Sequence, residues 1–354
     1  MDSFRQWQKG VRLDLNKMQL VSFCMEDRIS MVHGSGGAAT SELIGAIFAK
    51  EFSNDTLNQM EDSAVVAGDE RIAVTTDSFV VTPMCYPGGN IGRLCICGTV
   101  NDLLMRGAKP KYITCGFILQ EGMEVSVLQE IVHAMAETAR EAGVEIIAGD
   151  TKVVSGAGEC FINTTGVGFV PKDREVSAGR VAEGDVVLVS GNLGDHHAAI
   201  LSGRMGIKNS IESDNAPLGE IVEALFAAGV EVHTMRDVTR GGLATVLKEL
   251  AKASNTSITL EEETLPVTPQ VRDFCGLLGL DPLYMGNEGK LVAIVPAAQK
   301  EAALSAMKSA KYGQDAVMIG TVTKEEPGKL FLRTRIGGLR NLEVLQGEGL
   351  PRIC

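Results

Sequence analysis

The hydrophobic positions in the first half of the chain follow two kinds of pattern. Short apolar runs, typical of strands, occur at 64–66, 71–76, 112–119, 144–148 and 161–169. Longer segments with apolar residues three or four positions apart predict helices at 43–52, 92–107 and 127–139, the last closed by Gly143 as a C-cap. This half is therefore expected to combine strands and helices in one domain.

The second half continues this mixture. Strands are predicted at 186–189, 291–295, 317–322 and 330–333, and helices at 243–253 and 297–311. Residues 235–242 are polar and rich in glycine, which predicts a loop that lines a cleft. Because helices and strands alternate without a strict βαβ repeat, the sequence predicts an α+β fold.

The length of 354 residues is enough for two domains, each with its own core. The polar segment Pro171–Glu175 is the predicted junction. We expect an N-terminal extension at 1–28, an N-terminal domain at 29–171, a C-terminal domain at 172–344 and a flexible tail at 345–354. The tail contains Gly347 and Gly349 and has little apolar periodicity.

Composition excludes some classes of partner. Hydrophobic content of 45% and charged content of 22% are ordinary globular values. The net charge of −12 argues against nucleic acid or an anionic membrane as a partner, since both need a positive face. No apolar run approaches the roughly 20 residues of a membrane helix, and no signal peptide is recognisable at the N-terminus. We therefore expect a cytoplasmic protein.

The chain has eight cysteines, and none of them forms a CxxC pair. Most lie in apolar segments, where a reduced cysteine packs as a small core residue. Cys354 differs because it is the last residue and no chain beyond it blocks access. The ten-residue tail, fully extended, reaches at most about 33–36 Å, which is enough to carry a thiol into a cleft.

Two features predict a site for a phosphate-bearing ligand. Four carboxylates, Asp62, Asp77, Asp102 and Asp150, lie at strand ends or inside a helix, and oxygen-only ligands favour Mg²⁺. The loop His33–Gly37 runs into a predicted helix, an arrangement that binds phosphate through backbone NH groups.

The alternatives for the glycine loop are weaker. It also fits a dinucleotide fingerprint, but the segment before it is short and charged where a buried strand is needed. It is no Walker A loop, because no Gly-Lys-Ser/Thr follows. The pair His196-His197 is expected to be structural or on the surface, since adjacent side chains diverge on a helix.

Several motifs together resemble the ATP-dependent superfamily of aminoimidazole ribonucleotide synthetase, which also contains selenophosphate synthetase and thiamine-monophosphate kinase. These motifs are His33–Gly37, Thr76–Ser78, Gly88–Gly92, Asn101–Asp102, Gly149–Lys152, Asp237–Gly242 and Asn287–Lys290. The terminal Pro351-Arg352-Ile353-Cys354 narrows the resemblance to the carbamoyl dehydratases of NiFe hydrogenase maturation. It covers about residues 29–354, and residues 1–28 depart from the pattern.

The resemblance implies two α+β domains of the aminoimidazole ribonucleotide synthetase type. It implies a homodimer paired through the N-terminal sheets, a C-terminal α/β sandwich domain, and Mg²⁺ and ATP bound beside the N-terminal sheet. Cys354 would receive a carbamoyl group from the carbamoyltransferase HypF, and the cyanide would pass to the HypC–HypD complex.

The resemblance and the motifs also suggest individual roles. The candidates for ATP binding are His33, Gly34, Gly36, Gly37, Asp62, Asp77, Asn101, Asp102, Gly149, Asp150 and Thr151, with Asp62, Asp77, Asp102 and Asp150 also holding the metal. The candidate catalytic residues are Cys354, Lys152 and Glu288, and the candidate cleft residues are Asp237, Arg240 and Asn287.

The implied reaction converts a cysteine S-carboxamide to a thiocyanate and must expel the amide oxygen, a poor leaving group. Attack of that oxygen on the γ-phosphorus of ATP turns it into a phosphate ester, and ADP and phosphate result. Lys152 and Glu288 are both candidates for proton transfer. Nearby carboxylates oppose the depressed pKa that a catalytic lysine needs, which makes Glu288 the better base and Lys152 an electrostatic clamp.

Two other functions fit part of the pattern. A selenophosphate synthetase-like kinase would carry a reactive cysteine near the N-terminal loop, where this chain has His33. A thiol carrier or scaffold without enzymatic activity would pass a modified Cys354 to its partners. ATP turnover that depends on a carbamoylated tail separates the enzyme from the carrier.

Overall fold

The computed structural model describes residues 37–38, 41, 64–66, 71–120, 122–154 and 159–346, with the side chains of 64–66, Val125, Ala148 and 150–153 left out. All of these residues belong to one compact unit, Met31–Cys354. The predicted extension, the predicted helix at 43–52 and the tail beyond Gln346 lie outside the described residues.

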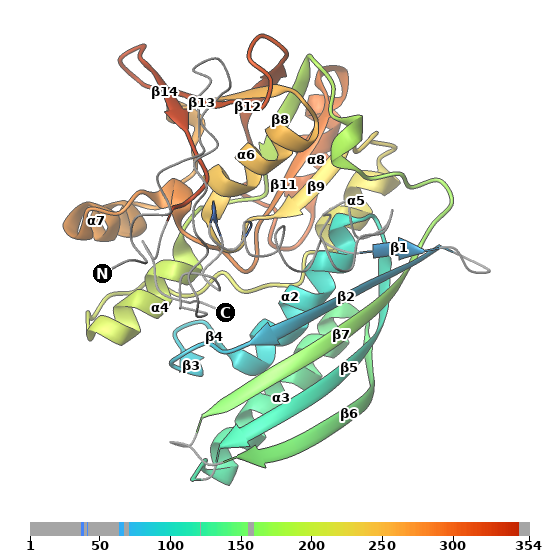
Figure 1. The fold of residues 1–354 in the computed structure, drawn as a ribbon, viewed down its shortest axis with the longest axis vertical. Helices are drawn as coiled ribbons and strands as arrows, with labels where there is room; N and C mark the ends of the chain where they lie inside the picture. The colour runs from blue at the N-terminus through green and yellow to red at the C-terminus, as the bar shows by residue number, and fades with distance from the viewer. Residues whose placement is uncertain are drawn as a thin grey trace, which may run out of the picture. The chain divides into compact units, whose positions relative to one another are not determined.

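The N-terminal half forms a five-stranded sheet in the order β1-β2-β7-β5-β6 (Figure 1). All neighbouring strands are antiparallel except β5 and β6. The five strands are β1 (Ala64–Val66), β2 (Arg71–Phe79), β5 (Lys109–Gln120), β6 (Glu145–Val154) and β7 (Cys160–Val170). Each prediction for this sheet is confirmed, and the strands other than β1 are longer than predicted.

Helices cover one face of this sheet, and no helix of the described residues covers the other, which we call the open face (Figure 1). They are α2 (Ile91–Met105), which follows the short hairpin of β3 (Cys85–Tyr86) and β4 (Gly89–Asn90), and α3 (Val125–Ala142), which ends at Gly143 as predicted. The open face carries exposed or half-buried apolar side chains, among them Val74, Tyr112, Ile118, Phe161, Val167 and Phe169.

Helix α2 is the structural centre of the described part. Asn90 caps it, because its Oδ1 accepts the N–H groups of Gly92 and Arg93 at 2.9 and 3.0 Å. The helix is buried on nearly all sides, between the sheet, α3 and elements of the second half. A helix that is apolar all round belongs in an interior, and α2 therefore carries Asn101 and Asp102 deep into the molecule.

The second half forms a seven-stranded sheet in the order β14-β13-β10-β12-β8-β11-β9. Only β10 and β13 run parallel. The strands are β8 (Asp185–Val189), β9 (Thr234–Asp237), β10 (Ser257–Glu261), β11 (Leu291–Pro296), β12 (Val317–Thr323), β13 (Leu330–Arg333) and β14 (Leu339–Leu342). The helices are α4 (Asp195–Met205), α5 (Gly219–Ala227), α6 (Gly242–Ala253), α7 (Pro269–Leu278) and α8 (Lys300–Ser309).

Helices pack on both faces of this second sheet. Alternate residues of β8 join two different cores: Leu188 packs in the core that contains α5 and α8, and Val187 packs in the core that contains α6. The first of these cores also includes α2 and α3, so it is continuous with the N-terminal half. The predicted α+β fold with two parts is confirmed.

Two local predictions need correction. Met235–Asp237 was expected in a loop but forms most of β9, because its backbone pairs with β11 and Met235 is buried. The helix expected at 297–311 is a 3-10 turn at Ala297–Gln299 followed by α8, which stops at Ser309. Helices α5 and α7 and strands β10 and β14 were not predicted. Among the described residues, no helix has the length and apolar character needed to cross a membrane.

Candidate functional site

Four acidic side chains from both halves of the chain influence one another electrostatically. Asp77 comes from β2, Asp102 from α2, Asp237 from the end of β9 and Glu288 from the loop before β11. We call these four residues the acidic cluster. Asp102 accepts a hydrogen bond of 2.7 Å from the Thr75 hydroxyl, which fixes its orientation.

The acidic cluster has an excess of negative charge. Burial is the main cause that raises the pKa of each of its carboxyl groups, because it disfavours the charged form. The charges of Asp237 and Asp77 then raise the pKa of Asp102 and of Glu288 further, well above their ordinary values. The pKa of Asp237 is raised to about 6. Arg240 opposes these shifts, so an added cation would stabilise the charged cluster further.

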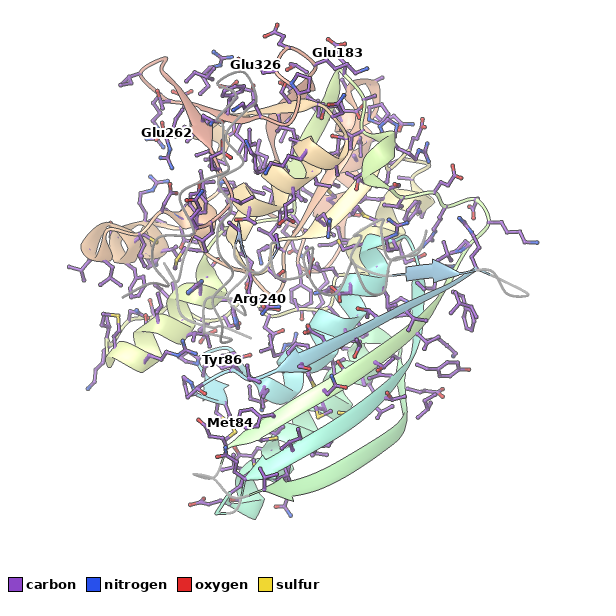
Figure 2. The ribbon with its side chains drawn as sticks, in the orientation of Figure 1. Met84, Tyr86, Glu183, Arg240, Glu262 and Glu326 are labelled. Atoms are coloured by element: carbon purple, nitrogen blue, oxygen red, sulfur yellow. The ribbon has the colours of Figure 1, made fainter. Side chains whose placement is uncertain are left out.

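Arg240 belongs to the loop between β9 and α6, and Figure 2 shows it between the two sheets in that view. It is exposed, and its charge lowers the pKa of all four acidic residues. That Asp237 and Arg240 line a cleft stays a prediction.

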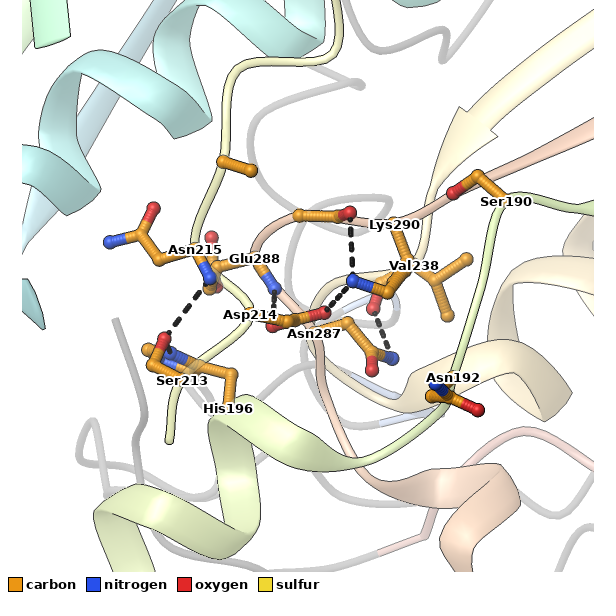
Figure 3. A network of polar contacts seen from close by, with 12 residues as sticks. Ser190, Asn192, His196, Ser213, Asp214, Asn215, Val238, Asn287, Glu288 and Lys290 are labelled. Atoms are coloured by element: carbon orange, nitrogen blue, oxygen red, sulfur yellow. Dashed lines mark hydrogen bonds and ion pairs between the residues drawn. The ribbon is translucent and has the colours of Figure 1, made fainter. Parts of the chain in front are cut away.

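Glu288 is held by its backbone more than by its side chain. The residue is only 4% exposed, and its Oε1 has no hydrogen-bond partner among the described residues. Its neighbour Asn287 is fully buried and fixed: Oδ1 accepts the Gly194 N–H at 2.7 Å and Nδ2 donates to the Val238 carbonyl at 3.1 Å (Figure 3). A buried carboxylate oxygen without a partner suits a group that takes up a proton.

Asn101 was a candidate for ATP binding, but both ends of its amide are engaged elsewhere. Its Nδ2 donates to the Ala216 carbonyl at 3.0 Å, and its Oδ1 accepts the Leu218 N–H at 2.9 Å. In this structure Asn101 therefore joins α2 to the chain of the second half. It does so one residue before Asp102, which belongs to the acidic cluster.

The Gly149–Lys152 motif lies on β6, at the far edge of the sheet from β2. Strands β7 and β5 separate them, so the two backbones are roughly 14 Å apart at the usual strand spacing. The motif is extended, and the side chains of Asp150, Thr151 and Lys152 lie outside the described residues. Within one chain, this strand order does not bring the backbone of the motif beside β2.

The remaining predicted residues lie at or beyond the described ends. His33, Gly34, Gly36, Asp62 and Cys354 are outside the described residues. Among the described ones, no three His, Cys, Asp or Glu side chains form a group that could hold a metal ion. The predicted metal site therefore stays a prediction.

Gly37 links the glycine loop to the start of the tail. Its φ of +83° is left-handed, and a Cβ there would collide with the Leu345 carbonyl oxygen. The N–H of the next residue, Ala38, donates to that same oxygen at 3.1 Å, and the Leu345 N–H donates to Thr245 Oγ1 at 3.1 Å. The first residue of the predicted tail is thus fixed against the predicted phosphate loop.

Residues that the sequence did not single out support the Glu288 loop. Asp214 accepts the Glu288 N–H at 3.0 Å and forms an ion pair of 3.1 Å with Lys290. Ser213, beside Asp214, bonds His196 through its hydroxyl at 2.7 Å. Residues 208–215 have no apolar period and no motif spacing, so no sequence signal indicated them.

Comparison with known proteins assigns the family. Residues 60–170 match the N-terminal domain of AIR synthase related proteins, and residues 182–333 match their C-terminal domain. Carbamoyl dehydratase HypE of Rhodobacter capsulatus is 45% identical over 337 residues, which cover 93% of this chain and 99% of that protein. The chain belongs to the HypE family of carbamoyl dehydratases.

Solved structures agree with this assignment. The structure of a HypE–HypF complex contains a chain that is 44% identical, with a TM-score of 0.82 and coverage of 86% of this chain and 99% of that one. A HypE structure in complex with ATP is 43% identical, with a TM-score of 0.78 and coverage of 92% and 99%. The resemblance seen in the motifs and the terminal cysteine is confirmed.

Proposed function

We propose that this chain is an ATP-dependent carbamoyl dehydratase that converts an S-carboxamide on Cys354 to a thiocyanate, as a source of cyanide for hydrogenase maturation. The near full-length identity to HypE proteins carries this proposal. The hydrogen bond from the Ala38 N–H to the Leu345 carbonyl supports it, because it joins the first residue of the predicted tail to the residue that follows Gly37. Nine residues lead from Leu345 to Cys354, and extended they reach about 30 Å.

ATP is proposed to bind at the glycine loop and the acidic cluster, together with Mg²⁺. The donors are carboxylate oxygens, which suit this ion, and the raised pKa of Asp102 indicates a site that gains from an added cation. Asp77 and Asp102, with the predicted Asp62 and Asp150, would hold the metal. When bound, it would offset the negative charge of the phosphates.

The proposed chemistry follows from the bonds that must form and break. The carboxamide oxygen of modified Cys354 attacks the γ-phosphorus, and ADP leaves. The C–O bond of the resulting phosphate ester then breaks, phosphate leaves, and the nitrogen loses its two protons as the C≡N bond forms. Glu288 is proposed to take up one of these protons, because its Oε1 is buried and has no hydrogen-bond partner in the part of the chain that the structure describes. Lys152 is proposed as the clamp on the phosphate charge.

The proposal includes a homodimer built from two N-terminal sheets. The open face of the sheet carries apolar residues such as Ile118, Val167 and Phe169, which a partner sheet would cover. Such a pairing would also let the Gly149–Lys152 motif of one protomer approach the acidic cluster of the other, which the strand order of one chain does not allow. HypF and the HypC–HypD complex are the proposed partners.

Several other parts of the picture remain proposals. They are the boundaries at 28, 171 and 344, the location in the cytoplasm, the flexible character of the predicted tail beyond Leu345, and the roles of His33, Gly34, Gly36, Gly149 and Thr151 at ATP.

Mass spectrometry of the protein after incubation with ATP, carbamoyl phosphate and the carbamoyltransferase tests the central claim. We expect a mass increase on Cys354 equal to CN replacing hydrogen, and its loss in Cys354→Ala with ATP binding intact. Cys85→Ala is a matched control, because Cys85 is an exposed thiol in the described part. An adduct on another cysteine would contradict the proposal, and a carbamoyl adduct on Cys354 that is not dehydrated in the presence of ATP would favour a carrier.

A further inference from the structure

Glu288 must be placed accurately if it is to act on the substrate, yet its own side chain has no described bond at Oε1. Its position therefore depends on how the loop before β11 is held. Asp214, from the segment between α4 and α5, holds this loop: the Glu288 N–H donates to Asp214 Oδ1 at 3.0 Å. The Glu288 carbonyl accepts the Ala216 N–H at 3.3 Å, so the two segments are bound at two points.

Asp214 is itself held from the other side of the loop. Its Oδ2 pairs with Lys290 Nζ at 3.1 Å, and both side chains are largely buried, at 5% and 12% exposed (Figure 3). Gly289 lies between the two partners of Asp214, and a Cβ there would collide with the Asp214 carbonyl oxygen. The Asp214 carboxylate thus contacts both Glu288 and Lys290, the residues before and after Gly289.

We propose that Asp214 is a positioning residue, which orients Glu288 through its backbone N–H and uses the ion pair with Lys290 to keep its own carboxylate in place. This inference rests on the proposed role of Glu288 in proton transfer. Asp214 also contributes charge, because it is one of the groups that raise the pKa of Glu288 after burial, Asp237 and Asp77. The other groups that interact electrostatically with Glu288 are Arg240, Tyr86 and Cys97.

The test compares two ways of removing Asp214. Asp214→Ala loses both the acceptor for the Glu288 N–H and the partner of Lys290. The double variant Asp214→Asn with Lys290→Gln keeps an oxygen for that N–H and a neutral pair of similar size. We expect kcat for dehydration to fall about 100-fold in the alanine variant, the effect of a small misplacement, and to return to within about 10-fold in the double variant. The KM for ATP should change little in both.

The pH profile separates positioning from a general loss of structure. The single variant Asp214→Asn removes a negative charge near Glu288 and leaves Lys290 charged, so the acidic limb of its kcat profile should move to lower pH. Asp315→Asn is the control, since Asp315 is an exposed carboxylate near Gly191 and the Lys290 side chain but outside the Glu288 loop. Its profile should match that of the parent. An unchanged kcat in Asp214→Ala would overturn the proposal, and so would a double variant as slow as the alanine variant together with an unmoved acidic limb in Asp214→Asn.

Hydrogen exchange at the Glu288 amide distinguishes this proposal from the proposed function. The amide should exchange faster in Asp214→Ala and at nearly the parent rate in the double variant, whatever reaction the protein performs. If Glu288→Gln dehydrates at the parent rate, the role of Glu288 fails. If the exchange rate in Asp214→Ala also stays at the parent value, the positioning by Asp214 fails independently.

Discussion

The two halves of the chain meet in two polar clusters with opposite electrostatics, and helix α2 contributes to both. Near its start, Arg93 pairs with Glu141 at 3.0 Å, and Glu141 also binds Lys311 and Tyr312 at 2.5 and 2.6 Å. We call these four residues the ion-pair cluster. Near its end, Asp102 belongs to the acidic cluster.

The pKa values show what this difference means. Burial alone would raise the pKa of Glu141, but the hydrogen bonds from Lys311, Tyr312 and Arg93 outweigh it and lower the pKa to about 2. In the acidic cluster, burial and like charges both raise the pKa values. The ion-pair cluster is thus complete by itself and stabilises the fold. The acidic cluster is costly by itself, which is typical of a site that awaits a cationic or proton-bearing ligand.

The largest expected effect is on the rate of dehydration, which should depend on the acidic cluster and not on the ion-pair cluster. Glu288→Gln removes the proposed base without changing size, and the rate of dehydration should fall by about 10²–10⁴-fold. Glu141→Gln removes a carboxylate from the ion-pair cluster and should leave the rate close to that of the parent. Single-turnover formation of the Cys354 adduct measures both. Equal losses in the two variants would mean that Glu288 acts only through the fold.

The second prediction concerns the sign of a stability change. Asp102→Asn removes one repelling charge and keeps an oxygen for the Thr75 hydroxyl, so without metal the protein should become more stable by about 1–3 kcal/mol at neutral pH. Its affinity for ATP with Mg²⁺ should fall by about 10–100-fold. Urea unfolding and calorimetry measure the two effects. A less stable variant with unchanged affinity would show that Asp102 is structural.

The secondary structure could be predicted from the sequence only in part. The strands of the first sheet were predictable because each contains a short apolar run, whereas β9 was not, because Arg236 and Asp237 are polar and the strand is held by backbone pairing with β11. Helix α5 is only nine residues long, too short for its three buried apolar residues to form a clear period.

The candidate site was predictable only through its motifs. Asp77 and Glu288 are far apart in sequence, so the spacing of residues could not indicate that they share a cleft. Only the resemblance to a family suggested it. Asp214 was missed because its role arises from a tertiary contact with the Glu288 N–H, which leaves no local pattern. The separation of the Gly149–Lys152 motif from β2 follows from strand order, which periodicity does not report.

The third prediction uses pH. Burial, together with the charge of Asp214, raises the pKa of Asp195 from 3.8 to about 6. A group whose pKa is raised on folding contributes stability below its unfolded pKa and loses it as the pH rises through the folded one. The contribution of Asp195 should therefore fade between pH 3.8 and about 6, and Asp195→Asn should exceed the parent by up to about 3 kcal/mol at pH 8.

Chemical unfolding at pH 4 and pH 8 tests this, with Asp315→Asn as the exposed control. The difference between Asp195→Asn and the parent should be small at pH 4 and grow by pH 8. The same difference at both pH values would show that Asp195 does not titrate in this range.

The smallest expected effect lies in the ion-pair cluster. Glu141→Gln keeps the shape but loses the charge that binds Arg93 and Lys311, and because these side chains are partly exposed the cost should be only about 1 kcal/mol at neutral pH. The folded pKa of Glu141 is lowered, so its contribution is present above the ordinary value of 4.5 and is lost as the pH falls toward about 2. The destabilisation caused by Glu141→Gln should therefore shrink in acid, whereas the stabilisation caused by Asp195→Asn grows as the pH rises.

Added salt should also reduce the destabilisation caused by Glu141→Gln, since exposed ion pairs are screened. A double-mutant cycle with Lys311→Gln measures the pair directly, and a coupling of zero at low salt would mean that the cluster holds the two halves together by packing alone.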